Sequence, residues 1–152
     1  HEYLEKHYDE FDFIWSSPPC PTHSDIRRCA VHSGRYKAVY PDMELYQEII
    51  LLKHFAKGSW IVENVRPYYK YLIDPDFIIN RHPFWSNIAL DSERFEDTRI
   101  VHNDITSNDT IYGFNIKDDK IKGYKGGKRK ILRNLVNPAI GEIILKAVAE
   151  SI

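Results

Sequence analysis

The chain has 152 residues, of which 43% are hydrophobic and 28% are charged, and its formal net charge is −1. These values describe one globular domain with a single core, and no internal repeat or low-complexity tract interrupts it. No apolar stretch reaches the length of about 20 residues that spans a bilayer, which excludes a transmembrane helix. With two cysteines and no signal-peptide pattern, the sequence predicts a cytoplasmic protein that folds without disulfides and has no membrane partner.

The first part of the chain alternates between strand and helix patterns. The opening "HEYLEKHYDE" has the character of the end of a helix, and a strand is expected over about 11–16, where aromatic residues with high β-propensity recur. A polar loop follows. A helix is then expected over about 42–56, with Asp42 as its N-cap and Gly58 just beyond its end.

Further strand patterns come next. The segment 59–65, "SWIVENV", predicts a second buried strand, and 76–90 predicts one or two more strands that break near Pro83. The sequence strand, loop, helix, strand is half of a doubly wound α/β sheet.

The end of the chain predicts a helix over 137–152. Asn137 is expected to cap it, Pro138 takes its first position, and apolar residues then recur at helical spacing. The polar segment 91–127 before it has weak periodicity and is assigned to no element. Lysine, arginine and glycine gather between 117 and 133, which is typical either of a solvated loop or of a loop that binds a phosphate backbone.

Two motifs with complementary chemistry stand at the ends of the first two predicted strands: one follows the first strand and the other closes the second. "SSPPC" ends at Cys20, and "ENV" begins with Glu63. Doubly wound sheets bind ligands at the carboxyl ends of their strands, so we expect Cys20 and Glu63 at the same edge. A thiolate is a strong nucleophile and a carboxyl group can hold or donate a proton. Together they could attack and protonate a ring.

These motifs resemble those of the cytosine-5 DNA methyltransferases. The nucleophile motif of that family, proline, cysteine, glutamine, any residue, phenylalanine, serine, is matched at Pro19, Cys20 and Ser24. Pro21 and His23 replace its glutamine and phenylalanine. The glutamate-asparagine-valine motif of the family is complete at 63–65 and follows the expected interval of strand, helix and strand.

Two further matches are partial. "RNLVNPAIGEIIL" is similar to the family's glycine-asparagine-alanine-valine motif and its following helix, and the matching residues are Asn134, Val136 and Pro138. "NRHPFWSN" stands where the family has a strand that supplies an arginine to the target base, which makes Arg81 the candidate. The usual glutamine and second arginine of that strand are absent.

The resemblance implies an α/β fold, namely a partial doubly wound, Rossmann-like methyltransferase sheet that lacks the N-terminal cofactor-binding strands. It divides the chain into a catalytic half-domain (1–90), a short DNA-recognition segment (91–130) similar to those of phage and prophage enzymes, and a C-terminal motif and helix (131–152) that pack back on the sheet. The glycine-rich loop of the cofactor site is not found. An upstream segment, a second chain or self-association is therefore expected to complete the site.

The implied activity is that of a DNA (cytosine-5) methyltransferase, in restriction-modification or in phage self-protection. A methyl group would pass from S-adenosyl-L-methionine to carbon 5 of a flipped-out cytosine through a covalent adduct with Cys20. Glu63 would protonate the ring, and Arg81 would hold the base's carbonyl oxygen. The supporting residues are Pro19, Ser24, Asn64 and Val65. The cofactor-binding residues are Ser17, Pro18, Asn134 and Val136. The phosphate contacts to double-stranded DNA are Lys122, Lys125, Lys128, Arg129 and Lys130.

Three other interpretations stay open at this point. Two C-x-x-H pairs have side chains that could bind zinc, and they are Cys20 with His23 and Cys29 with His32. Only five residues separate the two pairs, which is too few for a usual zinc module, so no metal site is predicted. "SPPC" also resembles the serine-proline-proline-aromatic motif of amino DNA methyltransferases, although cysteine cannot stack on a base and "ENV" has no role there. A non-catalytic DNA-binding remnant or half-domain is the third interpretation.

Overall fold

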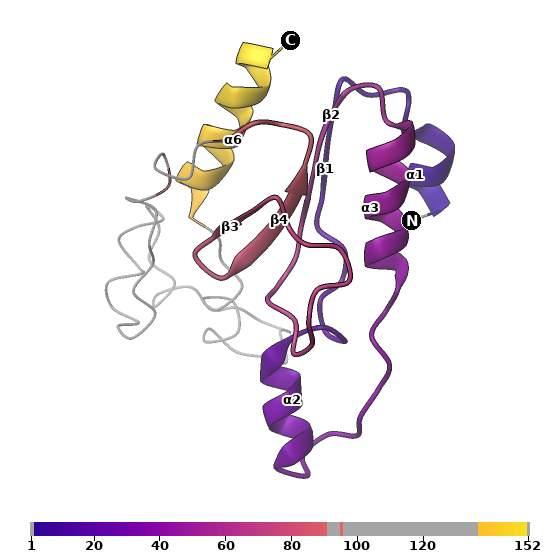
Figure 1. The fold of residues 1–152 in the computed structure, drawn as a ribbon, viewed down its shortest axis with the longest axis vertical. Helices are drawn as coiled ribbons and strands as arrows, with labels where there is room; N and C mark the ends of the chain where they lie inside the picture. The colour runs from indigo at the N-terminus through magenta and orange to yellow at the C-terminus, as the bar shows by residue number, and fades with distance from the viewer. Residues whose placement is uncertain (1, 91–94, 96–136, 152) are drawn as a thin grey trace, which may run out of the picture.

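The computed structural model describes residues 2–90, 95 and 137–151. Figure 1 shows the arrangement of the elements in these ranges. In chain order they are α1 (Glu2–His7), β1 (Phe13–Ser16), α2 (Asp25–His32), α3 (Glu44–Phe55), β2 (Ser59–Glu63), β3 (Phe77–Ile79), β4 (His82–Ser86) and α6 (Pro138–Ser151).

The four strands form one mixed sheet in the order β1-β2-β4-β3. β1 and β2 are parallel, with Phe13 opposite Ser59 and Ser16 opposite Val62. β4 is antiparallel to both of its neighbours, and Glu63 at the end of β2 lies opposite Phe84. Because β1 and β2 run in the same direction, the loops that follow them leave the sheet at the same edge.

Helices cover both faces of the sheet, α3 one face and α6 the other (Figure 1). The residues buried between the sheet and α6 are Ile61, Ile79, Phe84, Ile88, Phe95, Ile140, Ile144, Ala147 and Val148. The residues buried on the α3 side are Ile14, Leu45, Tyr46, Ile49, Leu52, Trp60, Val62 and Trp85. β2 supplies both clusters, which explains why its sequence is continuously apolar and does not alternate. The chain is therefore an α/β structure.

The two long helices agree with their predicted ranges. The predicted cap of the first, Asp42, lies one residue outside the observed N-cap Met43, but its Oδ1 accepts the N–H of Glu44 at 3.1 Å. Asn137 caps α6 as predicted, since its Oδ1 accepts the N–H of Ala139 at 3.0 Å. Short polar side chains before an apolar repeat thus indicate where both helices begin.

One local prediction is wrong, and one is displaced by two residues. α2 occupies part of the expected polar loop, and none of its eight residues is buried. The break predicted near Pro83 falls two residues before it, at Asn80 and Arg81. Asn80 adopts a φ of 58°, a conformation that asparagine tolerates in tight turns, whereas Pro83 lies inside β4.

The predicted recognition segment, 91–130, lies outside the described residues except for Phe95, which packs into the α6 side of the core. Residues 131–136 lie outside them as well. Within the part of the chain that the structure describes, no helix is both long and apolar enough to cross a bilayer.

Candidate active site

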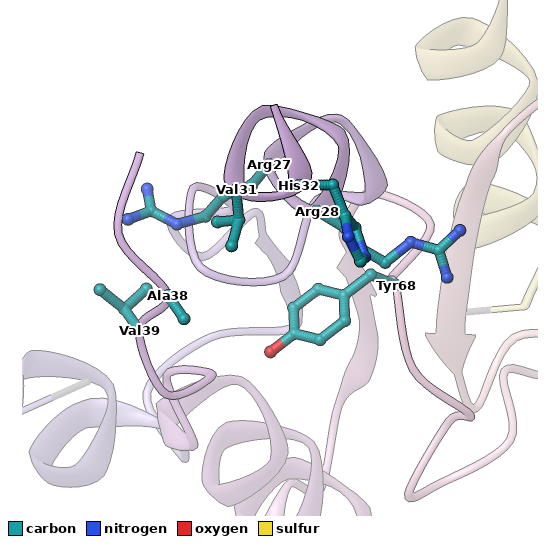
Figure 2. A pocket seen from close by; sticks show the side chains of 7 residues that line it. All are labelled: Arg27, Arg28, Val31, His32, Ala38, Val39 and Tyr68. Atoms are coloured by element: carbon teal, nitrogen blue, oxygen red, sulfur yellow. The ribbon is translucent and has the colours of Figure 1, made fainter. Parts of the chain in front are cut away.

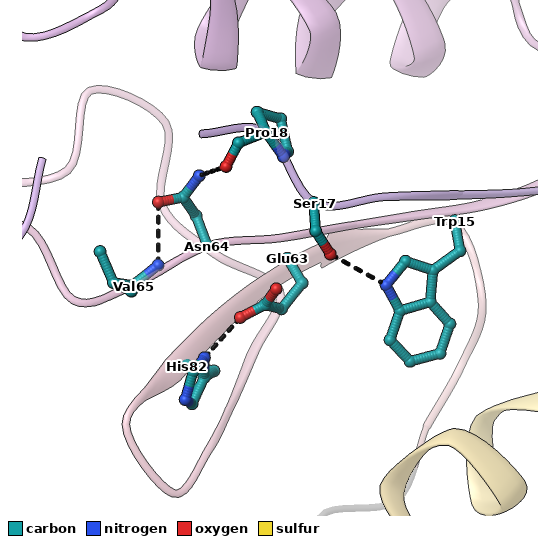
Figure 3. A network of polar contacts seen from close by, with 7 residues as sticks. All are labelled: Trp15, Ser17, Pro18, Glu63, Asn64, Val65 and His82. Atoms are coloured by element: carbon teal, nitrogen blue, oxygen red, sulfur yellow. Dashed lines mark hydrogen bonds and ion pairs between the residues drawn. The ribbon is translucent and has the colours of Figure 1, made fainter. Parts of the chain in front are cut away.

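Asn64 joins the two motif-bearing loops at the carboxyl ends of β1 and β2. Its side chain is buried, and its Nδ2 donates to the carbonyl oxygen of Pro18 at 3.1 Å (Figure 3). Its Oδ1 accepts the N–H of Val65 at 2.9 Å, and its own N–H donates to the carbonyl of Pro83 at 3.2 Å. A single amide side chain therefore fixes the "SPPC" loop to the "ENV" loop.

Cys20 begins a tight turn within the first loop. Its carbonyl oxygen accepts the N–H groups of His23 at 3.0 Å and Ser24 at 3.2 Å, and Pro19 precedes it. The thiol is half-buried, and burial raises its pKa; the negative charge of Glu63 raises the pKa further, although a backbone hydrogen bond opposes both. Glu63 is thus near enough to act electrostatically on the thiol, and the free protein holds Cys20 mainly in its protonated form.

Glu63 itself is held by a histidine from the neighbouring strand. His82 Nδ1 donates to Glu63 Oε1, and the two side chains keep only 19% and 15% of their surfaces exposed (Figure 3). Glu63 lies opposite Phe84, so His82, two residues earlier, is its diagonal neighbour on the same face. His82 is not among the residues that the motifs single out. Its neighbour Arg81, the arginine that the motifs single out, lies exposed in the turn between β3 and β4.

Ser17 stands at the carboxyl end of β1 in a polar setting. Its Oγ accepts the indole N–H of Trp15 at 3.2 Å, so the hydroxyl proton is left to donate to a ligand (Figure 3). The Pro18 carbonyl, which already accepts from Asn64, keeps a second lone pair. These groups are compatible with the polar cofactor that the resemblance implies, but on their own they do not define its pocket.

The loops after β1 and β2 also pair along their length. Ser24 and Pro67 form an antiparallel bridge, and the Tyr68 N–H donates to the carbonyl of His23 at 3.1 Å. The His23 side chain is 1% exposed, with Nδ1 2.5 Å from the hydroxyl of Tyr69. Its Nε2 has no partner among the described residues. Burial lowers the pKa of His23 and raises that of Tyr69, so both side chains are neutral near pH 7.

A basic segment, residues 25–41, begins and ends near the candidate site. The Asp42 N–H donates to Thr22 Oγ1 at 2.9 Å, which closes the base of the segment two residues from Cys20. The segment has one aspartate and four basic residues, which are Arg27, Arg28, Arg35 and Lys37. Tyr40 near its end is 94% exposed.

A pocket of about 100 Å³ lies between α2 and the loop after β2. Figure 2 shows Tyr68 facing α2 across it, with Val31 and Val39 at its side and the side chains of Arg27 and Arg28 directed to opposite sides. The basic segment is not among the predicted phosphate contacts. In the sequence this segment is indicated by an excess of basic over acidic residues in 25–41. The lysine run further along the chain has a larger excess of basic residues.

Several predicted site residues lie outside the described ranges. They are the cofactor candidates Asn134 and Val136 and the phosphate-contact candidates Lys122, Lys125, Lys128, Arg129 and Lys130.

The paired C-x-x-H residues do not converge. Cys20 is half-buried and Cys29 is exposed on α2, while His23 Nδ1 is engaged by Tyr69. Across residues 2–90, 95 and 137–151, no three histidine, cysteine, aspartate or glutamate side chains are grouped so that they could hold a metal ion.

The candidate site is therefore defined by Cys20, Glu63, Asn64 and His82 at the carboxyl ends of β1 and β2. Comparisons with models of protein families, with curated proteins and with solved structures found no match to this chain.

Proposed function

We propose that this chain carries the catalytic motifs of a DNA (cytosine-5) methyltransferase. The observation that carries the proposal is the hydrogen bond from Asn64 to the Pro18 carbonyl. It ties a loop that contains a cysteine nucleophile to a loop that begins with a carboxyl group, at one edge of two parallel strands. That combination suits a reaction in which one face of a ring is attacked while a ring nitrogen is protonated.

In the proposed reaction, the Cys20 thiol loses its proton to water and its sulfur bonds to carbon 6 of the cytosine. The π electrons of the C5–C6 bond move toward carbon 5, while Glu63, which takes up a proton from water when the base is bound, gives that proton from its second carboxyl oxygen to ring nitrogen 3. Carbon 5 is then nucleophilic. After methylation, loss of the carbon 5 proton to water restores the double bond, expels the Cys20 sulfur as thiolate and returns the nitrogen 3 proton to Glu63.

S-adenosyl-L-methionine, when bound, supplies the methyl group that carbon 5 takes. Ser17 and Pro18 are the described residues that would contact it, through the hydroxyl proton of Ser17 and the Pro18 carbonyl. We propose that Asn134 and Val136 contribute from the C-terminal motif. The amino-methyltransferase interpretation has no task for a carboxyl group whose charge acts on the thiol, so the covalent route is favoured.

Double-stranded DNA is the proposed partner. Phosphate contacts position a duplex without reading its sequence, and they come mostly from lysine and arginine. The basic segment 25–41 places four such residues on the chain that begins at the Cys20 turn. We propose that it acts together with Lys122, Lys125, Lys128, Arg129 and Lys130.

We propose that the sheet is the second half of a Rossmann-like methyltransferase sheet. Among the described residues β1 is an edge strand, paired only with β2. Trp15 on this strand keeps 37% of its surface exposed. A strand from an upstream segment or from a second chain is the proposed neighbour of β1, because unpaired edge strands are usually covered.

The proposal is tested by trapping. The protein, S-adenosyl-L-methionine and duplex DNA that contains 5-fluorocytosine are mixed, and denaturing gels are examined for a covalent complex. Fluorine at carbon 5 blocks the last elimination, so the adduct with Cys20 accumulates. We expect a complex with the parent and with Cys29→Ser, which removes the exposed cysteine, and none with Cys20→Ser.

A complex that survives in Cys20→Ser would overturn the assignment of the nucleophile. If the parent gives no complex, a lysate from cells that express the chain together with its upstream coding region is tested next. The absence of a complex there as well, with duplex binding intact, would leave a DNA-binding half-domain and contradict the proposed activity.

A further inference from the structure

The hydrogen bond between His82 and Glu63 is not required by the motifs, yet it occupies the centre of the candidate site. Both side chains are more than four-fifths buried, and they come from adjacent antiparallel strands whose register is fixed by the sheet. A buried carboxyl group is costly without a partner, so this contact is a defined feature of the fold and not a chance surface pair.

The contact determines which part of Glu63 faces the site. Because His82 Nδ1 donates to Oε1, that oxygen is occupied, and Oε2 is the oxygen that remains for another group. A carboxyl group held on one side has less freedom to rotate. His82 therefore selects the orientation in which Glu63 presents its second oxygen.

The contact between His82 and Glu63 also affects Cys20 electrostatically. The negative charge of Glu63 is one of the causes that raise the pKa of the Cys20 thiol. An N–H that points at the carboxylate places positive charge beside it and offsets part of its field. Any change at His82 is therefore transmitted to the thiol by way of Glu63.

We propose that His82 is a positioning residue of the candidate site: it orients Glu63, offsets part of its charge and thereby tunes the reactivity of Cys20. The inference deepens the proposed function and rests on it for the reaction served, but the coupling among the three side chains is measurable without methylation.

The test measures the alkylation of Cys20 by iodoacetamide across a range of pH. All proteins carry Cys29→Ser, so that Cys20 is the one thiol. The pH of half-maximal rate is compared among the parent, Glu63→Gln, His82→Ala and the double variant Glu63→Gln/His82→Ala. Circular dichroism of each protein checks that it is folded.

We expect Glu63→Gln to lower the midpoint, because it removes the negative charge that acts on the thiol. His82→Ala is expected to raise the midpoint, because the Glu63 charge loses its offset. In the Glu63→Gln background, His82→Ala should have no further effect, since its influence passes through the carboxyl group. His82→Asn, which keeps an N–H near the position of Nδ1, should return the midpoint toward that of the parent.

Equal shifts from His82→Ala in both backgrounds would overturn the inference, because His82 would then act without Glu63. The absence of a shift in His82→Ala would overturn it as well. If the trapping experiment fails while the coupling is present, the proposed activity falls and the positioning role of His82 stands. If trapping succeeds, His82→Ala should lower the rate of adduct formation more than it weakens duplex binding, and His82→Asn should restore the rate.

Discussion

His23 shows how one buried side chain can shape the turn that holds Cys20. It stands where the resembling family has phenylalanine, and it packs against Tyr46 and Tyr69 with ring centroids 6.5 and 6.0 Å away. Its backbone closes the Cys20 turn, while its Nδ1 contacts the Tyr69 hydroxyl. An imidazole can fill the place of a phenyl ring, but it also brings a group that can titrate.

We predict that stability falls on acidification in a way that depends on His23. Burial lowers the pKa of His23 below the ordinary value of 6.5, although Asp42 opposes this shift. The unfolded chain therefore binds a proton at a higher pH than the folded chain does. The free energy of unfolding should decrease as pH falls below about 6.5 and level off below the folded pKa. Urea denaturation between pH 8 and pH 4.5 measures this decrease.

The matched variants for this prediction are His23→Phe and His23→Gln. Neither side chain titrates in this range, so the decrease with falling pH should be smaller in both than in the parent. Carboxyl groups elsewhere contribute equally to all three proteins, and the difference between the curves isolates His23. Identical slopes in the parent and both variants would contradict the prediction.

At the residue scale, the sequence predicts positions better than partners. Cys20 and Glu63 can be expected at one edge because each follows a recognisable strand. The partner of Glu63 depends on the register between β2 and β4, which shifts every contact if it slips by one residue. Arg81 and His82 are adjacent in the sequence, yet one is exposed in the turn and the other lies beside Glu63. Only the position of the turn distinguishes them.

At the scale of elements, Gly58 fixes how α3 leads into β2. A Cβ atom at this position would lie 2.5 Å from the carbonyl oxygen of Asp12 and 2.8 Å from that of Phe11. The same Asp12 oxygen accepts the N–H of Ser59 at 2.9 Å and so sets the first rung between β1 and β2. These are backbone atoms at the entry to β1, and they cannot move aside without disturbing the pairing of β1 with β2.

Gly58→Ala is therefore expected to lower the free energy of unfolding by about 1–3 kcal/mol. Thermal denaturation followed by circular dichroism measures the loss. Gly141→Ala is the matched control, since a Cβ at this α6 position meets nothing within 4 Å and alanine favours helix by about 1 kcal/mol. A Gly58→Ala protein as stable as the parent would show that this close approach is not maintained in solution.

The elements that the sequence predicts are those that bury apolar side chains. α3, α6 and β2 have long apolar patterns with recognisable caps, and their ranges agree with prediction to within a few residues. α2 has only eight residues and contributes nothing to either core cluster. Two residues in the sequence of the β3–β4 hairpin could mark its turn, Pro83 and Asn80. The turn forms at Asn80, which tolerates positive φ.

At the scale of the whole molecule, the two core clusters share one sheet. β2 supplies Ile61 to the α6 side and Val62 to the α3 side, so the loss of either layer exposes the strand that supports the other. A layered structure of this kind is expected to unfold in a single cooperative transition.

We predict that Leu52→Ala in α3 and Ile144→Ala in α6 each lower that one transition. Both side chains are fully buried, and truncations of this type cost about 2–5 kcal/mol. Leu145→Ala, next to Ile144 but 54% exposed, should change the stability by less than about 0.5 kcal/mol. Calorimetry and tryptophan fluorescence should report the same midpoint in each variant. Two separate transitions would show that the layers fold independently.

The closed base of the segment 25–41 has a consequence for how this surface can diversify. Thr22 and Asp42 meet at one side of the base, and Ser24 meets Pro67 at the other. Once the ends of a loop are fixed, its closure entropy grows only with the logarithm of its length, by about 0.6 kcal/mol for each doubling. Insertions and deletions beyond the base should therefore be tolerated while the Cys20 turn keeps its form. The sequence and length of this exposed, basic segment can therefore change while the residues of the Cys20 turn keep their structure.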